Sequence, residues 1–182
     1  MKKMIIAAFA LVAFAVVPKV NAQTKMVGGA AMYPTKDIID NAVNSKDHTT
    51  LVAAVKAAGL VETLKGEGPF TVFAPTNEAF SKLPKETVPT LLKPENKATL
   101  TKILTYHVVA GRLSSADLWT KVKAGMGKAE LKTVAGGTLT VMAKGKKLYL
   151  VDEKGDKSWV TIADVFQKNG VIHVVNTVLM PN

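Results

Sequence analysis

The chain has 182 residues, no cysteine and a formal net charge of +10 at pH 7. Without cysteine there is no disulfide bond, no lipid-modified cysteine and no thiol catalysis, so packing alone must hold the fold. The basic charge raises the question of nucleic-acid binding, but the lysines are scattered and Arg112 is the only arginine. The composition predicts a solvated, lysine-rich surface with a general attraction to anionic cell surfaces or polysaccharides, and no nucleic-acid partner.

Residues 1–22 have the three regions of a secretory signal peptide. Lys2 and Lys3 precede an apolar run of 14 residues, Met4–Val17, which is shorter than the roughly 20 residues of a membrane-spanning helix. We expect cleavage after Ala22 and a secreted or periplasmic protein, with an uncleaved anchor as the alternative. Cleavage lowers the formal charge from +10 to +7, because three lysines leave and no acidic residue precedes Asp37. No transmembrane segment is expected in the remainder.

Residues 23–34 are small, glycine-rich and without a periodic pattern, so we expect a flexible lead-in. Residues 35–182 have the length of one domain that buries about 70% of its unfolded surface, and no internal repeat divides them. Helical spacing predicts a first helix around residues 38–43. It predicts a second that begins at Asp47 or Thr49 and ends at Gly59, a residue typical of helix C-termini.

The segment Thr71–Phe80 combines a strand, a corner and a helix start within ten residues. The strand is predicted to stop at Pro75, which has no backbone N–H to donate. Thr76 has the residue type of a helix N-cap, and the following residues supply an acidic first turn and an apolar face. We therefore expect this junction to lie at the centre of the fold.

The remaining chain changes from helical to strand periodicity. Pro94 opens the clearest predicted helix, which continues through Tyr106-His107 into an extended Val108-Val109. From residue 128 onwards apolar residues alternate, and the pairs Gly136-Gly137 and Asn169-Gly170 predict tight hairpins. Helices cluster first and strands later, which predicts an α+β fold with a largely antiparallel sheet.

The three histidines are the first candidates for chemistry. His107 falls on the apolar stripe of the helix after Pro94, so we interpret it as a core residue bonded to backbone, with a ligand or acid–base role as the alternative. His173 lies in a strand and faces away from Ile172 and Val174, whereas His48 is expected to be exposed. Their spacing matches no metal site, and the chain has no nucleophile or phosphate-binding motif, so we predict no metal, no cofactor and no catalytic residue.

Three motifs together resemble the fasciclin domain. They are Thr71–Phe80, the pair Tyr106-His107, and Gly170–Pro181, in the order and separation of that family. The resemblance implies helices packed on a wedge-shaped, mainly antiparallel β-sandwich, with the first and last motifs as paired central segments. It also implies that Tyr106 and His107 form a motif with an adhesive or a structural role. The residues that carry the likeness as structural signatures are Thr71, Phe73, Pro75, Thr76, Asn77, Phe80, Gly170, His173 and Asn176.

Two of these positions depart from the common pattern of the family. Asn77 and Asn176 stand where aspartate is usual, which weakens any role that needs a charge, such as cation binding, while leaving an acceptor for backbone hydrogen bonds. The resemblance implies an extracellular adhesion or interaction module. We expect it to be monomeric and non-catalytic and to bind a protein or polysaccharide surface. The alternatives are a periplasmic small-molecule binder and a glycan-processing enzyme that uses Tyr106 and His107.

Overall fold

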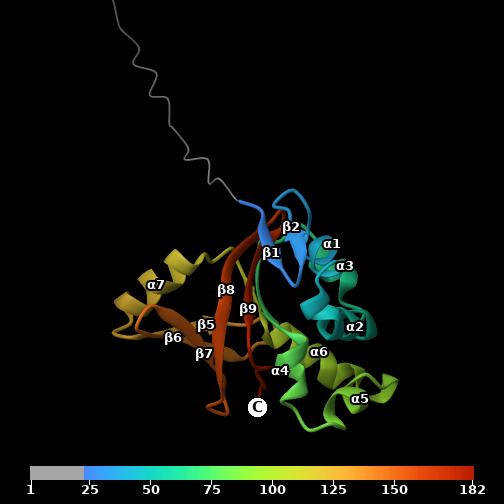
Figure 1. The fold of residues 1–182 in the computed structure, drawn as a ribbon. Helices are drawn as coiled ribbons and strands as arrows, with labels where there is room; N and C mark the ends of the chain where they lie inside the picture. Colours follow the sequence, from blue (N-terminus) through green and yellow to red (C-terminus); the bar gives the residue numbers. More distant parts are fainter. Residues whose placement is uncertain (1–22) are drawn as a thin grey trace, which may run out of the picture.

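The computed structural model describes residues 23–182, and the predicted signal peptide lies outside this range. A group of short helices and a curved sheet lie side by side (Figure 1). The fold is therefore α+β with a mainly antiparallel sheet, as the sequence predicts. Within residues 23–182 no helix has the length and apolar character needed to cross a membrane.

Two strands that are distant in the sequence form the centre of the sheet. β3 (Phe70–Pro75) pairs in parallel with β9 (Gly170–Val175), so that Phe73 lies opposite His173. The other neighbouring strands in the order β4-β3-β9-β8-β7-β6-β5 are antiparallel. These strands are β4 (Val108–Ala110), β5 (Lys128–Lys132), β6 (Thr138–Lys144), β7 (Lys147–Val151) and β8 (Lys157–Gln167).

The sheet curls so that its two ends approach each other. An isolated bridge joins Val109, in β4 at one end, to Thr133, which follows β5 at the other. The bend is concentrated in β8, which pairs with β7 near its start and with β9 afterwards, and whose register shifts twice around Ile162. A single long strand thus belongs to both halves of the sandwich, as register irregularities allow.

The helices gather on the outer side of the β3–β9 pair. Apart from α7 (Ser115–Ala124) they precede β4 in the chain and bury a cluster of aliphatic side chains against Val72, Ala74, Ile172 and Val174. They are α1 (Ile38–Ala42), α2 (Thr49–Ala58), α3 (Val61–Lys65), α4 (Asn77–Ser81), α5 (Thr87–Leu91) and α6 (Lys97–Tyr106), with 3₁₀ turns η1 (Lys46–His48) and η2 (Pro94–Asn96).

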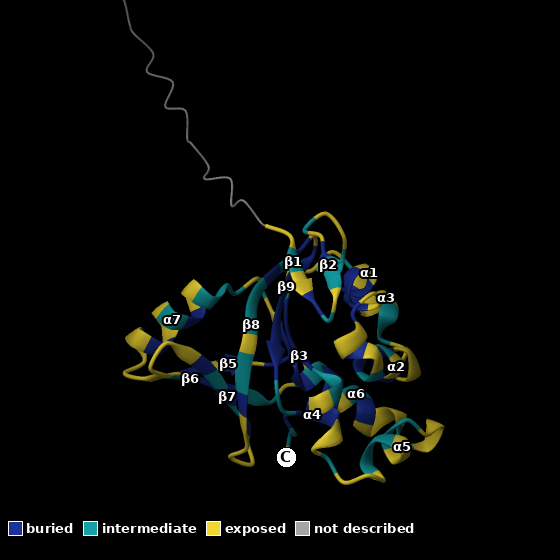
Figure 2. Cartoon of the chain, viewed as in Figure 1, coloured by how far each residue is buried: buried dark blue, intermediate teal, exposed yellow. Residues whose placement is uncertain are grey.

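A second buried cluster fills the inside of the curled sheet. Leu139, Val141 and Leu150 point inward from β6 and β7, where they meet Phe73 from the central strand. α7 (Ser115–Ala124) adds Leu118 and Val122 and packs on β5 and β6. Because β3 and β9 contribute to both clusters, they are the most deeply buried strands of the sheet (Figure 2).

Several local predictions are confirmed. Thr76 is the N-cap of α4, and its side chain accepts a hydrogen bond from the Ala79 N–H. α2 ends at Gly59 in the left-handed conformation. The hairpins between β5 and β6 and between β8 and β9 both form, although Lys132 pairs with Thr138, so residues 133–137 make the first connection longer than a tight two-residue turn. In the second hairpin Gln167 pairs with Gly170, so the turn lies one residue earlier than Asn169-Gly170 suggests.

The expectation of a flexible lead-in over residues 23–34 is wrong. β1 (Lys25–Val27) and β2 (Ala30–Met32) form an antiparallel hairpin. Val27 and Met32 are buried in the cluster beneath the helices, and the Lys25 ammonium donates to the Ala163 carbonyl at 2.5 Å. Glycine-rich sequence here supplies the positive φ angles of the turn at Gly28 and Gly29 rather than disorder.

Candidate functional site

His107 lies where α6 ends, and it connects that end to the C-terminal segment. The ring is buried, its Nδ1 is 2.8 Å from the Ile103 carbonyl, and its Nε2 is 3.0 Å from the Leu179 backbone nitrogen. Since Leu179 N–H can only donate, Nε2 must accept and Nδ1 must carry the proton. Burial lowers the pKa of His107 to about 4, so the ring is neutral at pH 7.

Tyr106, its neighbour in the motif, points into the interior of the curled sheet. Its hydroxyl donates to the Thr138 carbonyl at 2.8 Å and accepts from the Glu153 N–H at 3.2 Å. Burial raises the pKa of Tyr106 to about 12. The ring also leaves no space at Gly137, where a Cβ would come within 2.7 Å of it. Tyr106 thus connects α6 to the β5–β6 turn and to the turn after β7.

His173 faces the sandwich interior, opposite the helices. Its ring stacks on Phe73 with centroids 5.6 Å apart, its Nε2 is 2.8 Å from the Leu113 carbonyl, and its Nδ1 is 3.3 Å from the Asp164 backbone nitrogen. Burial lowers the pKa of His173. Both ring nitrogens of His107 and of His173 are therefore occupied by backbone groups, and neither ring is open to solvent.

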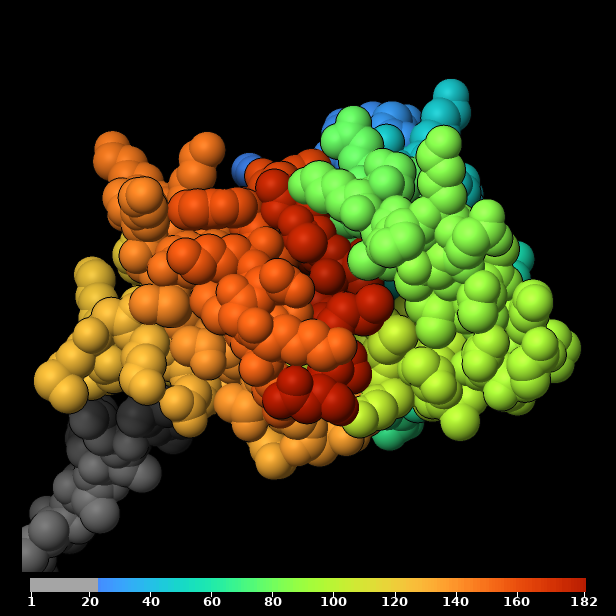
Figure 3. Space-filling view, turned by 90° about the horizontal axis from the view of Figure 1, so that it is seen from below, coloured from blue at the N-terminus to red at the C-terminus, as the bar shows by residue number. Residues whose placement is uncertain are grey.

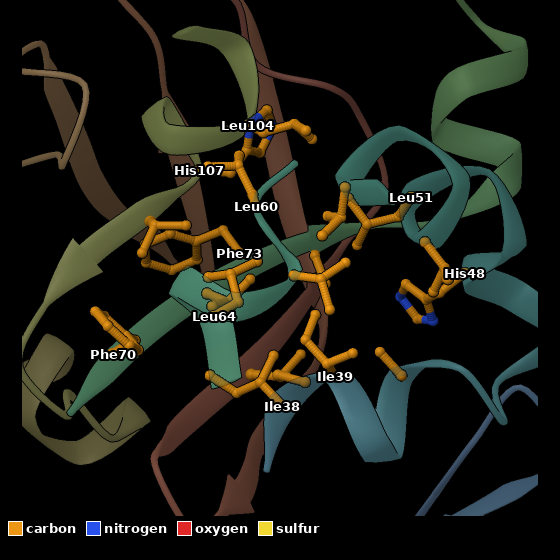
Figure 4. Close-up of a pocket in the computed structure, with 18 of the residues that line it drawn as sticks. Ile38, Ile39, His48, Leu51, Leu60, Leu64, Phe70, Phe73, Leu104 and His107 are labelled. Carbon is orange, nitrogen blue, oxygen red and sulfur yellow. The ribbon is translucent and has the colours of Figure 1, made fainter. Parts of the chain in front are cut away.

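The expectation that His48 is exposed is wrong, because η1 turns its side chain inward. Its Nδ1 is 2.9 Å from the Ser45 hydroxyl, and its Nε2 is buried with no hydrogen-bond partner. Burial lowers the pKa of His48. The ring borders an apolar cavity of about 70 Å³ between the helices and β3, on the side of Ile39 and Leu51 (Figure 4).

The two asparagines that replace aspartate tie segments together. Asn77, at the start of α4, accepts from the Thr50 N–H at 3.0 Å and donates to the Lys46 carbonyl at 2.8 Å, and so caps α2 from a distance. Asn176, just after β9, accepts from the Trp159 N–H at 2.9 Å. An aspartate at position 77 has no N–H for the Lys46 carbonyl, which gives a physical reason for the amide there.

The other signature residues are structural by position. The Thr71 hydroxyl is buried between Gly111 and Leu113, donating to the first at 2.7 Å and accepting from the second at 2.9 Å. Phe80 is buried among the helices, and Pro75 ends β3. A Cβ on Gly170 would lie 2.2 Å from the Phe70 carbonyl oxygen, so the parallel strand pair requires glycine at this position.

The acidic turn after β7 is bonded internally. Asp152 is buried and accepts from the N–H groups of Lys154, Asp156 and Met180 at 2.9–3.0 Å. Its oxygens are therefore engaged by backbone donors. Over residues 23–182 no group of three or more histidine or acidic side chains converges as a metal site would require.

The outer face of β6, β7 and β8 was not singled out by sequence reasoning. Met142, Tyr149 and Trp159 lie opposite one another across the three strands. The rings of Tyr149 and Trp159 are 4.8 Å apart at an angle of 39°, and both are half-buried. The repeated pattern Lys-x-aromatic, at Lys147–Tyr149 and Lys157–Trp159, is the signal that predicts this face, because alternate strand residues point the same way.

Aromatic and basic side chains point outward together on this face. In the space-filling view the β6–β8 residues, in orange, form a continuous surface that borders the red C-terminal segment (Figure 3). A hollow of about 330 Å³ lies beside Trp159 and is lined also by Lys147, Val160, Thr161 and Asn176. The opposite side of the same strands faces the second buried cluster.

Comparison with known proteins identifies the family. The fasciclin domain model matches residues 46–181, and the chain belongs to the fasciclin domain family. It is 47% identical over 159 residues to protein sll1483 of Synechocystis sp., covering 87% of this chain and 81% of that protein. It is 38% identical over 145 residues to the immunogenic protein MPB70 of Mycobacterium bovis, covering 77% and 66% of the two chains.

A solved structure shares the fold. It contains a FAS1 domain pair from the insect cell adhesion molecule Fasciclin I and superposes with a TM-score of 0.71 at 18% sequence identity. The match covers 80% of this chain and 51% of that chain, so the protein spans about half of the domain pair. At this level of identity the likeness concerns the fold.

Proposed function

We propose that the protein is an exported, non-catalytic adhesion and interaction module that binds a protein or polysaccharide surface as a monomer. Export is supported by the signal-peptide pattern of residues 1–22. Adhesion is supported by membership of the fasciclin family and by the fold shared with a domain pair from an insect cell adhesion molecule. A relative named as the cell surface glycolipoprotein MPB83, 35% identical over 160 residues, supports an extracytoplasmic location.

The observation that carries the proposal is the bonding of His107. A general acid or base must reach the substrate within hydrogen-bond distance, directly or through one water. Both ring nitrogens of His107 bond to backbone groups of the same chain, and its neighbour Tyr106 has a pKa raised to about 12. We therefore assign the Tyr106-His107 motif a structural role, in which it fastens α6 to the β5–β6 turn and to the C-terminal segment.

The small-molecule alternative has less support. The apolar cavity beside His48 has a volume of about 70 Å³, whereas pockets for small ligands usually measure about 300–1,000 Å³. The larger hollow lies on the outer face beside Trp159, where it opens on a basic surface. A surface that binds an extended partner fits this distribution of space better than an enclosed ligand pocket does.

A pull-down tests the proposal. The purified protein is immobilised and exposed to cell-envelope polysaccharides and surface proteins at low and at moderate salt. We expect a partner that is retained at moderate salt. At 0.1 M salt, attraction between exposed charges is largely screened beyond about 10 Å. Retention under these conditions therefore indicates a specific contact surface rather than a general attraction between lysines and anions. Failure to retain any envelope component at either salt concentration, or turnover of a glycan that disappears with His107→Gln, contradicts the proposal.

A further inference from the structure

The outer face of β6–β8 combines a row of neighbouring apolar side chains with cations at both flanks. Met142, Tyr149 and Trp159 form this apolar row, in which the Tyr149 hydroxyl is 3.4 Å from the Met142 sulfur. Two residues along the strands in one direction, Lys144 pairs with Lys147. Two residues along in the other direction lies Lys157, whose ammonium is 5.9 Å from the centre of the Tyr149 ring.

The cations on this face are not neutralised by the protein itself. Over residues 23–182 the ion pairs are Lys65 with Asp40 and Lys128 with Glu130. Lys144, Lys147 and Lys157, which we call the platform lysines, have no carboxylate within 4.0 Å and are exposed. Three uncompensated positive charges around a flat apolar row create a potential that favours an anionic partner.

Within the apolar row, Trp159 is anchored through its backbone. Trp159 lies near the start of β8, where its backbone N–H donates to the Asn176 side-chain oxygen at 2.9 Å and its carbonyl accepts from the Asn176 N–H at 3.2 Å. Asn176 belongs to the last family motif and also lines the hollow beside Trp159. The motif thus helps to position the half-buried Trp159, which lowers the conformational entropy that the protein itself loses on binding.

We propose that this face binds an acidic polysaccharide, with sugar rings packed on Tyr149 and Trp159 and their carboxylates paired with the platform lysines. This inference rests on the proposed function and assigns it a partner class and a site. Sugar rings have an apolar C–H face that suits the negative face of an aromatic ring. Lysine ammonium groups supply mobile point charges, which match carboxylates repeated along a chain.

The dimensions of the face favour a glycan over a folded protein. Three adjacent strands span about 10 Å between the outer two, so the apolar row has the length of a short saccharide. A stable protein interface covers about 800 Å² per partner and has a core poor in charge. Here the row is only one residue wide along each strand and has lysines two residues to either side.

The test uses the two tryptophans of the chain. In a Trp119→Phe background Trp159 is the only tryptophan, so its fluorescence reports on the face directly. The probe is a polygalacturonate oligosaccharide, and the matched ligand is its methyl ester, which keeps the rings and removes the charges. We expect polygalacturonate to change the Trp159 emission with saturation, and the methyl ester to bind at least several-fold more weakly.

Variants separate the specific face from general charge. In the otherwise native protein, with binding measured by isothermal titration calorimetry because the Trp159 reporter is absent, Trp159→Ala is expected to weaken polygalacturonate binding about tenfold or more, and Trp159→Tyr to restore most of it. The double variant Lys147→Ala/Lys157→Ala is expected to weaken binding several-fold. Its control, Lys85→Ala/Lys93→Ala, removes the same charge from exposed positions on the helical side and is expected to leave binding unchanged. Circular dichroism melting verifies that each variant is folded.

The outcomes distinguish this inference from the proposed function. Absence of polygalacturonate binding, or equal losses in the two double-lysine variants, overturns the inference. If the pull-down retains an envelope partner and this retention survives Trp159→Ala and Lys147→Ala/Lys157→Ala, the adhesion function stands and the face assignment fails. If Trp159→Ala fails to fold, the two double-lysine variants decide the matter, because both keep the Tyr149 and Trp159 rings.

Discussion

Replacing His107 by alanine is expected to destabilise the fold strongly. The imidazole occupies a buried site between the last turn of α6 and the C-terminal segment. It bonds to the Ile103 carbonyl and to the Leu179 N–H at 2.8 and 3.0 Å. Alanine neither fills the volume of the imidazole nor makes its two hydrogen bonds. Because Leu179 is fully buried, water cannot take the place of the imidazole without opening the core.

The size of the effect follows from these contacts. A buried polar group left without its partner costs about 1–3 kcal/mol, and His107→Ala leaves two such groups. Removing a large buried side chain leaves a cavity that adds further to the loss. Because the carbonyl of a helix end can accept other donors after small movements, we expect a total of about 3–5 kcal/mol. That is a large part of the 5–15 kcal/mol typical of a domain.

Urea unfolding followed by tryptophan fluorescence measures this change. Tyr106→Phe is the matched control, since it removes a neighbouring buried hydroxyl that bonds to Thr138 and Glu153 and leaves the ring and His107 in place. It is expected to lower the free energy of unfolding by about 1–2 kcal/mol. A His107→Ala protein with an unchanged free energy of unfolding and altered binding to envelope material refutes the structural role of His107.

Three further predictions concern titration, capping and packing. His107 has a folded-state pKa of about 4, so its contribution to stability is complete above its unfolded pKa of about 6.5 and is lost as the pH falls towards 4. The expected loss in the free energy of unfolding is about 3 kcal/mol. Urea unfolding at several pH values measures this loss, and a His107→Gln protein with the same pH dependence contradicts the assignment to His107. Asn77→Ala removes the remote cap of α2 and is expected to lower the free energy of unfolding by about 1–2 kcal/mol, whereas an unchanged value argues that water replaces the cap. Val55 lines the apolar cavity, so Val55→Ile adds one methylene there and is expected to raise the melting temperature through a gain of about 0.8 kcal/mol; a lower melting temperature contradicts the free space beside Val55.

The sequence predicts best the features whose cause is local. The junction around Pro75 and Thr76 depends on residues within one turn of each other, and Gly59 ends α2 through its own backbone conformation. The hairpins likewise follow from turn residues and alternation. The pairing of β3 with β9 is a contact between residues about 100 positions apart, and only the family resemblance indicates it.

Features that depend on distant partners were missed or misjudged. The cap of α2 comes from Asn77 rather than from Asp47 or Thr49, because tertiary packing brings the start of α4 to the start of α2. The β1–β2 hairpin forms in a segment expected to be flexible, because Val27 is buried under the helices. The sequence predicts an exposed His48 because the residue lies beside Asp47, a charged residue expected at a helix start. The burial of its ring depends on the path of η1, which the sequence does not reveal.

The central claim is that recognition takes place on the surface while the motif histidine supports the fold. The most direct measurement compares the retention of cell-envelope material by Trp159→Ala and by His107→Gln, at a temperature where circular dichroism shows both proteins folded. The account predicts that Trp159→Ala loses retention and that His107→Gln keeps it. Loss of retention in folded His107→Gln, with full retention in Trp159→Ala, contradicts the account.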